Sequence, residues 1–263
     1  MTSRFRPLVL LVIVAVVGLG AVVVAGGSWF EEAVPAPRSP NLPDLVSLPL
    51  ADFLVGTDEE GNEALRFSST IANAGDGPLM IRAGRAFGWS ERWRVVQWFD
   101  EPDGEPSGTV TGANLVLGGH GHEHWHLKFG VSYRLFSEDG RELASQTKAG
   151  FCFFDQVASH PELAGAPAEG VFKVSGCGRD GDTSVEMGMS VGWSDPYFWQ
   201  LEDQSVTITG LADGRYRLTA DADPDNWLTE TNEANNETWV VIALGTLPDG
   251  LRSVEVVESA PEP

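Results

Sequence analysis

Basic residues are scarce in this chain. Its 263 residues include 17 lysines and arginines against 38 aspartates and glutamates, which gives a formal net charge of −21. Binding to nucleic acid requires clustered lysine and arginine that displace counterions from phosphates, and we find no such cluster in the sequence. Nucleic acid is therefore excluded as a partner. An acidic surface keeps a protein soluble, and it also attracts cationic molecules such as amines.

Cysteine is rarer still, and only Cys152 and Cys177 are present. Two cysteines in an oxidising compartment pair by default. A bridge that closes a loop of this size would stabilise the fold by roughly 3–4 kcal/mol in the chain-entropy description. We therefore expect one disulfide, with two separate thiols as the alternative.

Charge is absent from residues 8–25, and Arg4 and Arg6 precede this apolar run. The run is longer than the usual core of a signal peptide and just long enough to span a bilayer. The small residues at 23–25 also fit a cleavage site, so residues 1–25 are either a removed signal peptide or a signal anchor. The arginines would stay in the cytoplasm. We therefore expect an extracytoplasmic domain, secreted or anchored by residues 8–25, that contacts the membrane only through this segment.

A sustained helical period is also missing from the rest of the chain. Residues 26–41 read as a proline-rich linker, and thirty glycines and sixteen prolines punctuate short apolar runs along the sequence. Strands are expected on both sides of turns within 64–81 and 205–223, and at 92–99 and 238–244. We predict an all-β domain, an antiparallel β-sandwich with long loops, over residues 42–245. An acidic tail, residues 246–263, should follow it and be disordered after Ser253.

Histidine occurs five times, and four of the five occupy alternate positions within seven residues: His120, His122, His124 and His126. From Trp125 onward alternate residues are apolar, a period of two that predicts a strand with one face in the core. All four histidines would then project from the other face. Neighbouring positions on one face are about 7 Å apart, so several imidazoles reach one ion only with local twist, which the adjacent glycines permit. Imidazole suits copper, zinc, nickel and iron, and ligand type alone leaves a copper site and a zinc hydrolase open.

Two later motifs, taken in order with the histidines, decide between these metals. Lys148 stands just ahead of Phe151 and Cys152, and a G-x-S-x-G segment at residues 188–192 leads into Asp195-Pro196-Tyr197. Together with H-x-H-x-H at residues 122–126, this order resembles the lysyl oxidase family. Residues 42–46, 65–75 and 229–236 are also similar, so the resemblance covers about residues 42–242.

The resemblance implies an enzyme, a copper amine oxidase of the lysyl oxidase type. Such an enzyme oxidises primary amines, small or peptidyl, to aldehydes with dioxygen, and releases hydrogen peroxide and ammonia. Lys148 and Tyr197 would form its lysine tyrosylquinone cofactor, which captures the substrate amine. Asp195 is a candidate general base, with turn capping as the alternative. The copper ligands implied by the resemblance are His122, His124 and His126.

Three points extend or qualify this resemblance. His120 has no counterpart in the family's ligand set, and we expect it to be either a further copper ligand or an outer hydrogen-bond donor. The resemblance also implies a calcium site that joins the two ends of the domain, against the alternative of a turn that satisfies its own backbone. Its ligands would be Asp44, the Leu45 carbonyl, Glu230, Asn232, Asn235 and Asn236. The alternative function is a non-catalytic metal-binding module for adhesion or copper handling, with Lys148 and Tyr197 unmodified.

Overall fold

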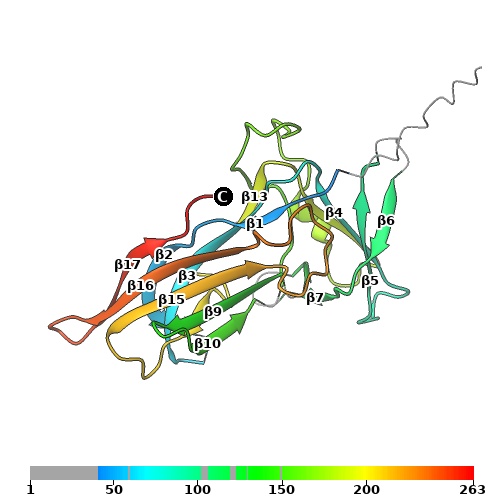
Figure 1. Cartoon of the computed structure of the whole chain (residues 1–263). Helices are drawn as coiled ribbons and strands as arrows, with labels where there is room; N and C mark the ends of the chain where they lie inside the picture. Colours follow the sequence, from blue (N-terminus) through cyan, green and yellow to red (C-terminus); the bar gives the residue numbers. More distant parts are fainter. Residues whose placement is uncertain (1–40, 59, 102–105, 119–122, 129, 149) are drawn as a thin grey trace, which may run out of the picture. The chain divides into compact units, whose positions relative to one another are not determined.

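Antiparallel strands make up nearly all the regular structure, which confirms the all-β prediction (Figure 1). The computed structural model describes residues 41–263 except 59, 102–105, 119–122, 129 and 149. The one helical element in this part of the chain is a short 3-10 turn, η1 (Val174–Cys177). No helix among the described residues is long and apolar enough to cross a membrane. Residues 8–25, where a signal or anchor is expected, lie outside them.

The largest sheet is built around β3 (Glu63–Asn73). This strand pairs along both of its edges, and both of its faces are buried along most of its length, where small and apolar residues predominate. Tyr197 and Asp195 reach the interior on a neighbour of β3. The other strands of this sheet are β1 (Leu45–Ser47), β2 (Ala51–Thr57), β11 (Val157–Ala158), β13 (Trp193–Tyr197) and β14 (Ser205–Thr207).

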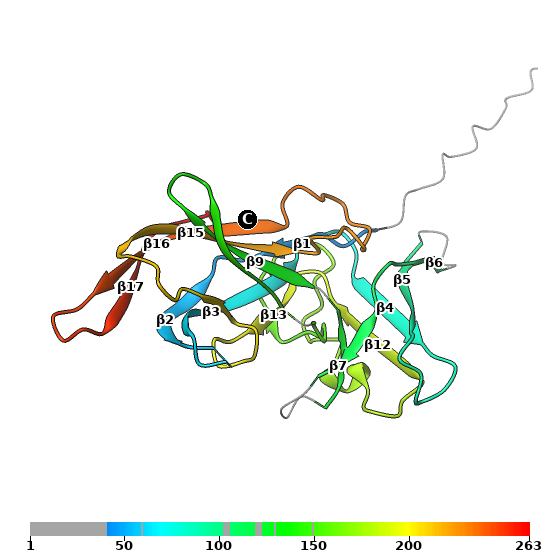
Figure 2. The ribbon, with the colours of Figure 1, turned by 90° about the horizontal axis from the view of Figure 1, so that it is seen from below.

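A five-stranded sheet packs against the first one (Figure 1, Figure 2). Its strands, in spatial order, are β10 (Glu142–Thr147), β9 (Val131–Ser137), β15 (Gly214–Ala222), β16 (Glu237–Thr246) and β17 (Arg252–Ser259). Phe67 on β3 meets Tyr133 on β9 edge to face, with ring centres 4.8 Å apart. The two sheets therefore share one core, as the predicted sandwich requires.

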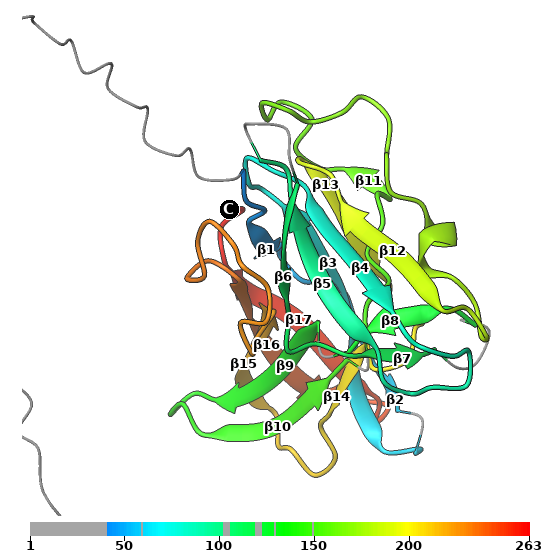
Figure 3. The ribbon, with the colours of Figure 1, turned by 90° about the vertical axis from the view of Figure 1, so that its right-hand side faces the viewer.

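A four-stranded sheet, in the order β12 (Ser184–Met189), β4 (Leu79–Gly84), β5 (Arg94–Phe99) and β6 (Ser107–Val110), lies beside a two-stranded one (Figure 3). The two-stranded sheet is formed by β7 (Leu115–Leu117) and β8 (Trp125–Leu127). Ile81, Val95 and Met187 are buried on the inner face of the larger sheet. Trp93 contacts Trp125 with ring centres 4.9 Å apart, which ties β8 to this sheet.

Two pairs of predicted strands form as expected but do not pair with each other. β3 and β4, from residues 64–81, enter different sheets, and so do β14 and β15, from residues 205–223. The loop after β14 turns at Gly210, whose φ of +77° favours glycine, and carries the chain from one sheet to the other. The alternation of buried residues is local, whereas partner choice depends on distant segments, so only the first can be predicted from sequence.

The strand predicted to run on from the histidines is divided in two. β8 ends at Leu127 and β9 begins at Val131, in a different sheet. Gly130 marks the change, because a Cβ atom there would lie 2.4 Å from the Phe151 ring. The predicted alternation of buried and less buried residues is present on both sides of this break, because Trp125 and Leu127 are buried and so are alternate residues of β9.

The expectation of a disordered C-terminal tail is wrong. β17 lies within residues 246–263 and pairs with β16 through a turn at Asp249 and Gly250. Gly250 has a φ of +86°, the left-handed conformation that favours glycine and often closes a short hairpin loop. The Asp-Gly pair and the alternating valines that follow it were the available signals, but the acidic composition of the segment suggested a tail instead.

Candidate functional site

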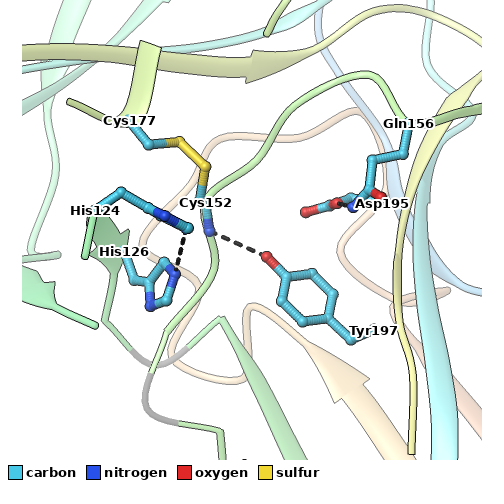
Figure 4. Close-up of a disulfide and its surroundings, with 7 residues drawn as sticks. All are labelled: His124, His126, Cys152, Gln156, Cys177, Asp195 and Tyr197. Atoms are coloured by element: carbon cyan, nitrogen blue, oxygen red, sulfur yellow. Dashed lines mark hydrogen bonds between the residues drawn. A yellow bond between two sulfur atoms is a disulfide. The ribbon is translucent and has the colours of Figure 1, made fainter. Parts of the chain in front are cut away.

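The two described histidines of the row point their ring nitrogens at each other (Figure 4). The Nε2 atoms of His124 and His126 are 2.9 Å apart, and the rings are nearly perpendicular. Two nitrogens that each lie about 2.0 Å from one ion, at a right angle, are about 2.9 Å apart. The pair therefore fits a single metal ion with imidazole ligands. His120 and His122 lie outside the described residues.

β8, which carries His126, lies next to the segment with Lys148, Phe151 and Cys152. Leu127 and Phe151 exchange two backbone hydrogen bonds, of 2.7 and 2.9 Å. Gly150 makes this approach close, because a Cβ atom at that position would lie 2.6 Å from the Cβ of His126. Gly150 and Phe151 thus lie directly alongside the histidine strand.

Lys148 is buried, with 6% of its surface exposed. Its Nζ donates a hydrogen bond of 3.1 Å to the backbone carbonyl of Glu202. The same atom lies 4.7 Å from the centre of the Tyr197 ring and 5.7 Å from the centre of the Phe151 ring. A lysine amine and a phenol from loci 49 positions apart in the sequence therefore meet in the interior.

Tyr197 lies on β13 opposite Ser69 of β3, and it is also buried. The backbone N–H of Cys152 donates a hydrogen bond of 3.1 Å to its hydroxyl oxygen (Figure 4). Burial, followed by the negative charge of Asp195, raises the pKa of the Tyr197 phenol well above its ordinary value. Without a bound cation, the phenol is thus protonated at neutral pH.

Asp195 is completely buried beside Tyr197. Its pKa is raised to about 8, because burial disfavours the carboxylate more than Gln156, Tyr197 and the Lys148 charge favour it. The side-chain amide of Gln156 donates a hydrogen bond to Oδ1 (Figure 4). Oδ2 has no hydrogen-bond partner among the described residues. Asp195 can therefore hold or accept a proton near neutral pH.

The serine of the G-x-S-x-G motif has a structural role that the sequence did not reveal. The Ser190 N–H and hydroxyl both donate to the buried carboxylate of Asp155, each at 2.8 Å. The same carboxylate accepts the N–H groups of Val171 and Phe172. Asp155 thus fixes the turn that leads into β13.

The expected disulfide between Cys152 and Cys177 is present. Both cysteines are buried, and Figure 4 shows the bridge in the same neighbourhood as the histidine pair and Tyr197. The bridge anchors Cys152, whose N–H holds the Tyr197 hydroxyl.

A second group of oxygen-rich side chains joins the start of the domain to the 229–236 turn. Glu230 accepts hydrogen bonds from the Leu45 N–H and from the Asn236 amide, and Asn235 donates one of 3.1 Å to Asp44. One side-chain oxygen on each of Asp44, Asn235 and Asn236 is buried without a hydrogen-bond partner in the described part of the chain. Unpartnered buried oxygens that converge on one place fit a hard cation such as calcium.

The structure alters the predicted composition of this group. Asn232 is exposed, and its side-chain oxygen accepts the Ala234 N–H instead. Two acidic residues that sequence reasoning missed, Asp223 and Glu233, bring ligand oxygens within 4.8 Å of Glu230 and of each other. Burial raises the pKa of Glu230 to about 8 and that of Asp223 to about 6, with further contributions from the neighbouring acids.

Comparison with known proteins agrees with these motifs. Residues 118–246 match the model of the lysyl oxidase family. Lysyl oxidase homolog 3B of Danio rerio is 28% identical over 172 residues, which cover 65% of this chain and 16% of that protein. Lysyl oxidase homolog 3A of the same organism is 28% identical over 174 residues, or 65% of this chain and 18% of that protein. The match thus spans less than a fifth of these relatives. Both comparisons agree with the resemblance: over residues 118–246 this chain is similar to the lysyl oxidase family.

Proposed function

We propose that this protein oxidises primary amines, small or peptidyl, to aldehydes, with dioxygen as the oxidant and hydrogen peroxide and ammonia as further products. Copper and a lysine tyrosylquinone would be its cofactors. One observation carries the proposal: the amine of Lys148 lies 4.7 Å from the centre of the Tyr197 ring in the interior. A solvated surface lysine and an ordinary packing tyrosine would have no reason to meet there.

His124 and His126 would hold the copper, together with His122 and with His120 as a further ligand or outer donor. The arrangement of the two described nitrogens supports this ligand set. Bound copper would supply the one-electron chemistry that converts the phenol, with dioxygen, into the quinone carbonyl that captures amines.

The chain's own residues would position and deprotonate the reacting groups. The Glu202 carbonyl and the wall formed by Phe151 hold Lys148 over the ring, and the Cys152 N–H holds the hydroxyl of Tyr197. Lys148 must lose a proton before its nitrogen can bond to the ring. Asp195, with its unpartnered Oδ2, is the proposed proton acceptor here and at the substrate carbon. It would act in its ionised form, and a pKa of about 8 leaves a minor ionised fraction at neutral pH whose affinity for a proton is high.

The disulfide favours an oxidising environment, so we propose that the domain works outside the cytoplasm, secreted or anchored through residues 8–25. We also propose that calcium binds between Asp44 and the 229–236 turn. Asp223 and Glu233 are added to the proposed ligands, and Asn232 no longer contributes a side-chain oxygen. Such an ion would join the two ends of the domain.

Intact-mass analysis of copper-loaded protein tests the proposal. Quinone formation adds one oxygen, removes several hydrogens and links the peptides that carry Lys148 and Tyr197, and staining for quinones becomes positive. The chain has three tyrosines, so Tyr216→Phe is a matched control that should keep the mass change, whereas Tyr197→Phe and Lys148→Arg should abolish it. An unmodified mass in the wild-type protein would favour the non-catalytic metal-binding module instead.

A further inference from the structure

The turn between β4 and β5 displays two large aromatic side chains to solvent. Phe87 is 56% exposed and Trp89 is 81% exposed. Their rings are parallel within 2°, with centres 5.1 Å apart. Exposed apolar groups that gather in one place indicate an interaction surface more often than single exposed residues do.

Arg85 holds this turn in place. Its guanidinium donates to the backbone carbonyls of Ser90 and Asp182, and it lies over the rings of Trp93 and Trp125, 4.6 and 4.5 Å from their centres. The aromatic pair therefore stands on a supported turn. Because Trp125 belongs to β8, the turn is also tied to the strand that carries His126 (Figure 3).

The hairpin formed by β4 and β5, residues 79–99, is basic in an otherwise acidic protein. It contains four arginines and one glutamate, a net charge of +3 in a chain of net charge −21. The arginines are spread over thirteen positions and do not stand out in the sequence, but the hairpin brings them together. Arg82, Arg85 and Arg94 line a depression of about 460 Å³ together with Trp98.

Two of these arginines are available to a partner. Arg92 and Arg94 are exposed, and no ion pair or hydrogen bond joins either guanidinium to another residue in the part of the chain that the structure describes. In a protein with more than twice as many acidic as basic residues, this arrangement favours an anionic partner.

We propose that the β4–β5 hairpin docks on the anionic surface of a phospholipid membrane. Phe87 and Trp89 would enter the interfacial layer, where aromatic rings are favoured, while Arg92 and Arg94 contact lipid phosphates. A soluble polyanion would satisfy the arginines but leave both rings in water. The net negative charge of the rest of the chain is repelled by the same surface, which favours an approach through this hairpin.

The linker between the expected membrane segment and the domain is long enough to allow this contact. Asn41 forms an isolated bridge with Asp100, the residue that follows β5, so the first described residue lies on this sheet. Residues 26–40 extend at most about 50 Å. A bilayer that held residues 8–25 would therefore be within reach of the hairpin, and a secreted form would reach it by diffusion. Membrane docking of the hairpin does not require the proposed oxidase activity.

A single fluorescent label tests the contact in the full-length chain. Neither cysteine is free, so Trp89→Cys gives one attachment site for an environment-sensitive dye, and Phe87→Cys gives a second. The labelled full-length protein is reconstituted into vesicles of phosphatidylcholine, with or without phosphatidylglycerol. We expect blue-shifted emission and quenching by brominated lipid only when phosphatidylglycerol is present, weakening at high salt.

Matched charge variants separate docking from simple tethering. Arg92→Gln with Arg94→Gln should reduce the quenching at least severalfold, whereas Arg215→Gln with Arg217→Gln, on the five-stranded sheet, should leave it unchanged. Near-ultraviolet circular dichroism verifies the fold of each variant. Emission that stays as in water at both label sites, or quenching that is equal in both kinds of vesicle, would overturn the proposal. A blue shift with a soluble polyanion and none with vesicles would also overturn it.

Discussion

The Nζ atom of Lys148 lies over the ring of Tyr197, 4.7 Å from its centre, and both side chains are more than nine-tenths buried. The contact depends on two separate connections. Leu127 and Phe151 join the histidine strand to the lysine segment, and the Cys152 N–H joins that segment to the Tyr197 hydroxyl. The groups that the proposed cofactor needs are therefore assembled by the fold itself, before any metal binds.

The raised pKa of Asp195 should appear as a pH dependence of stability. The aspartate is protonated in the folded protein up to about pH 8, but in the unfolded chain it loses its proton above about pH 4. The folded state thus binds one more proton in this window, so the free energy of unfolding should fall with rising pH, by at most about 1.4 kcal/mol per unit.

Urea unfolding of metal-free protein at several pH values measures this slope. Glu230 contributes in the same direction because its pKa is also raised to about 8, so the effect of Asp195 is the difference between wild type and Asp195→Asn. The substitution should flatten the curve. Identical slopes in the two proteins would show that Asp195 is ionised in the folded state.

Gln156→Leu should raise the pKa of Asp195 further. The exposed amide is the nearest donor to Oδ1, and it favours the carboxylate over the acid. We expect a loss of about 1–3 kcal/mol at pH 9, where the carboxylate is charged, and a smaller loss at pH 5. Gln146→Leu is the control, because it removes an amide bond of the same kind to a different carboxylate, that of Asp203. A loss in Gln156→Leu that does not change with pH would argue against the role of this amide.

Calcium should stabilise the metal-free protein. At a calcium concentration of a hundred times the dissociation constant, the gain is about 2.7 kcal/mol, and a chelator should remove it. Glu230→Gln should abolish most of the gain, whereas Glu186→Gln, which alters an exposed partner of Arg82, should not. Thermal unfolding with calcium and with chelator provides the measurement. Equal shifts in wild type and Glu230→Gln would place the ion elsewhere.

Loss of the disulfide should destabilise the fold. Its cysteines are 25 positions apart, which corresponds to roughly 3–4 kcal/mol. Cys152→Ala with Cys177→Ala is compared with wild type by urea unfolding, and wild type unfolded in the presence of a reductant provides a second form without the bridge. An unchanged midpoint in both would mean that the bridge contributes little to stability.

Much of the strand pattern can be read from the sequence because burial alternates along each strand. Leu135 and Tyr133 are buried as their spacing predicts, and β5 and β16 lie where apolar alternation indicates. The motif residues Lys148 and Tyr197 can be chosen only through resemblance to a family. Nothing in their local spacing shows that they meet.

Contacts between distant segments are what local reasoning misses. Asp223, the residue after β15, lies close to Glu230 of the proposed calcium site, although its sequence context is that of an ordinary strand end. Glu233 is also close, and it follows Asn232, the asparagine that the sequence suggested as a ligand. Gln156 reaches Asp195 because β11 pairs with β13, and no periodicity predicts such a pairing. These residues become visible only when the strands are placed next to their partners.

Because β3 lies at the centre of its sheet, its partner strands become available at different times during synthesis. Two of its neighbours, β1 and β2, precede it in the chain, but β13 and β14 follow about 120 residues later. The growing chain cannot complete this sheet, or bring Tyr197 to Lys148, until its last third has emerged. If the chain is exported unfolded, oxidation of the cysteines and maturation of the site become events of the destination compartment, not of synthesis.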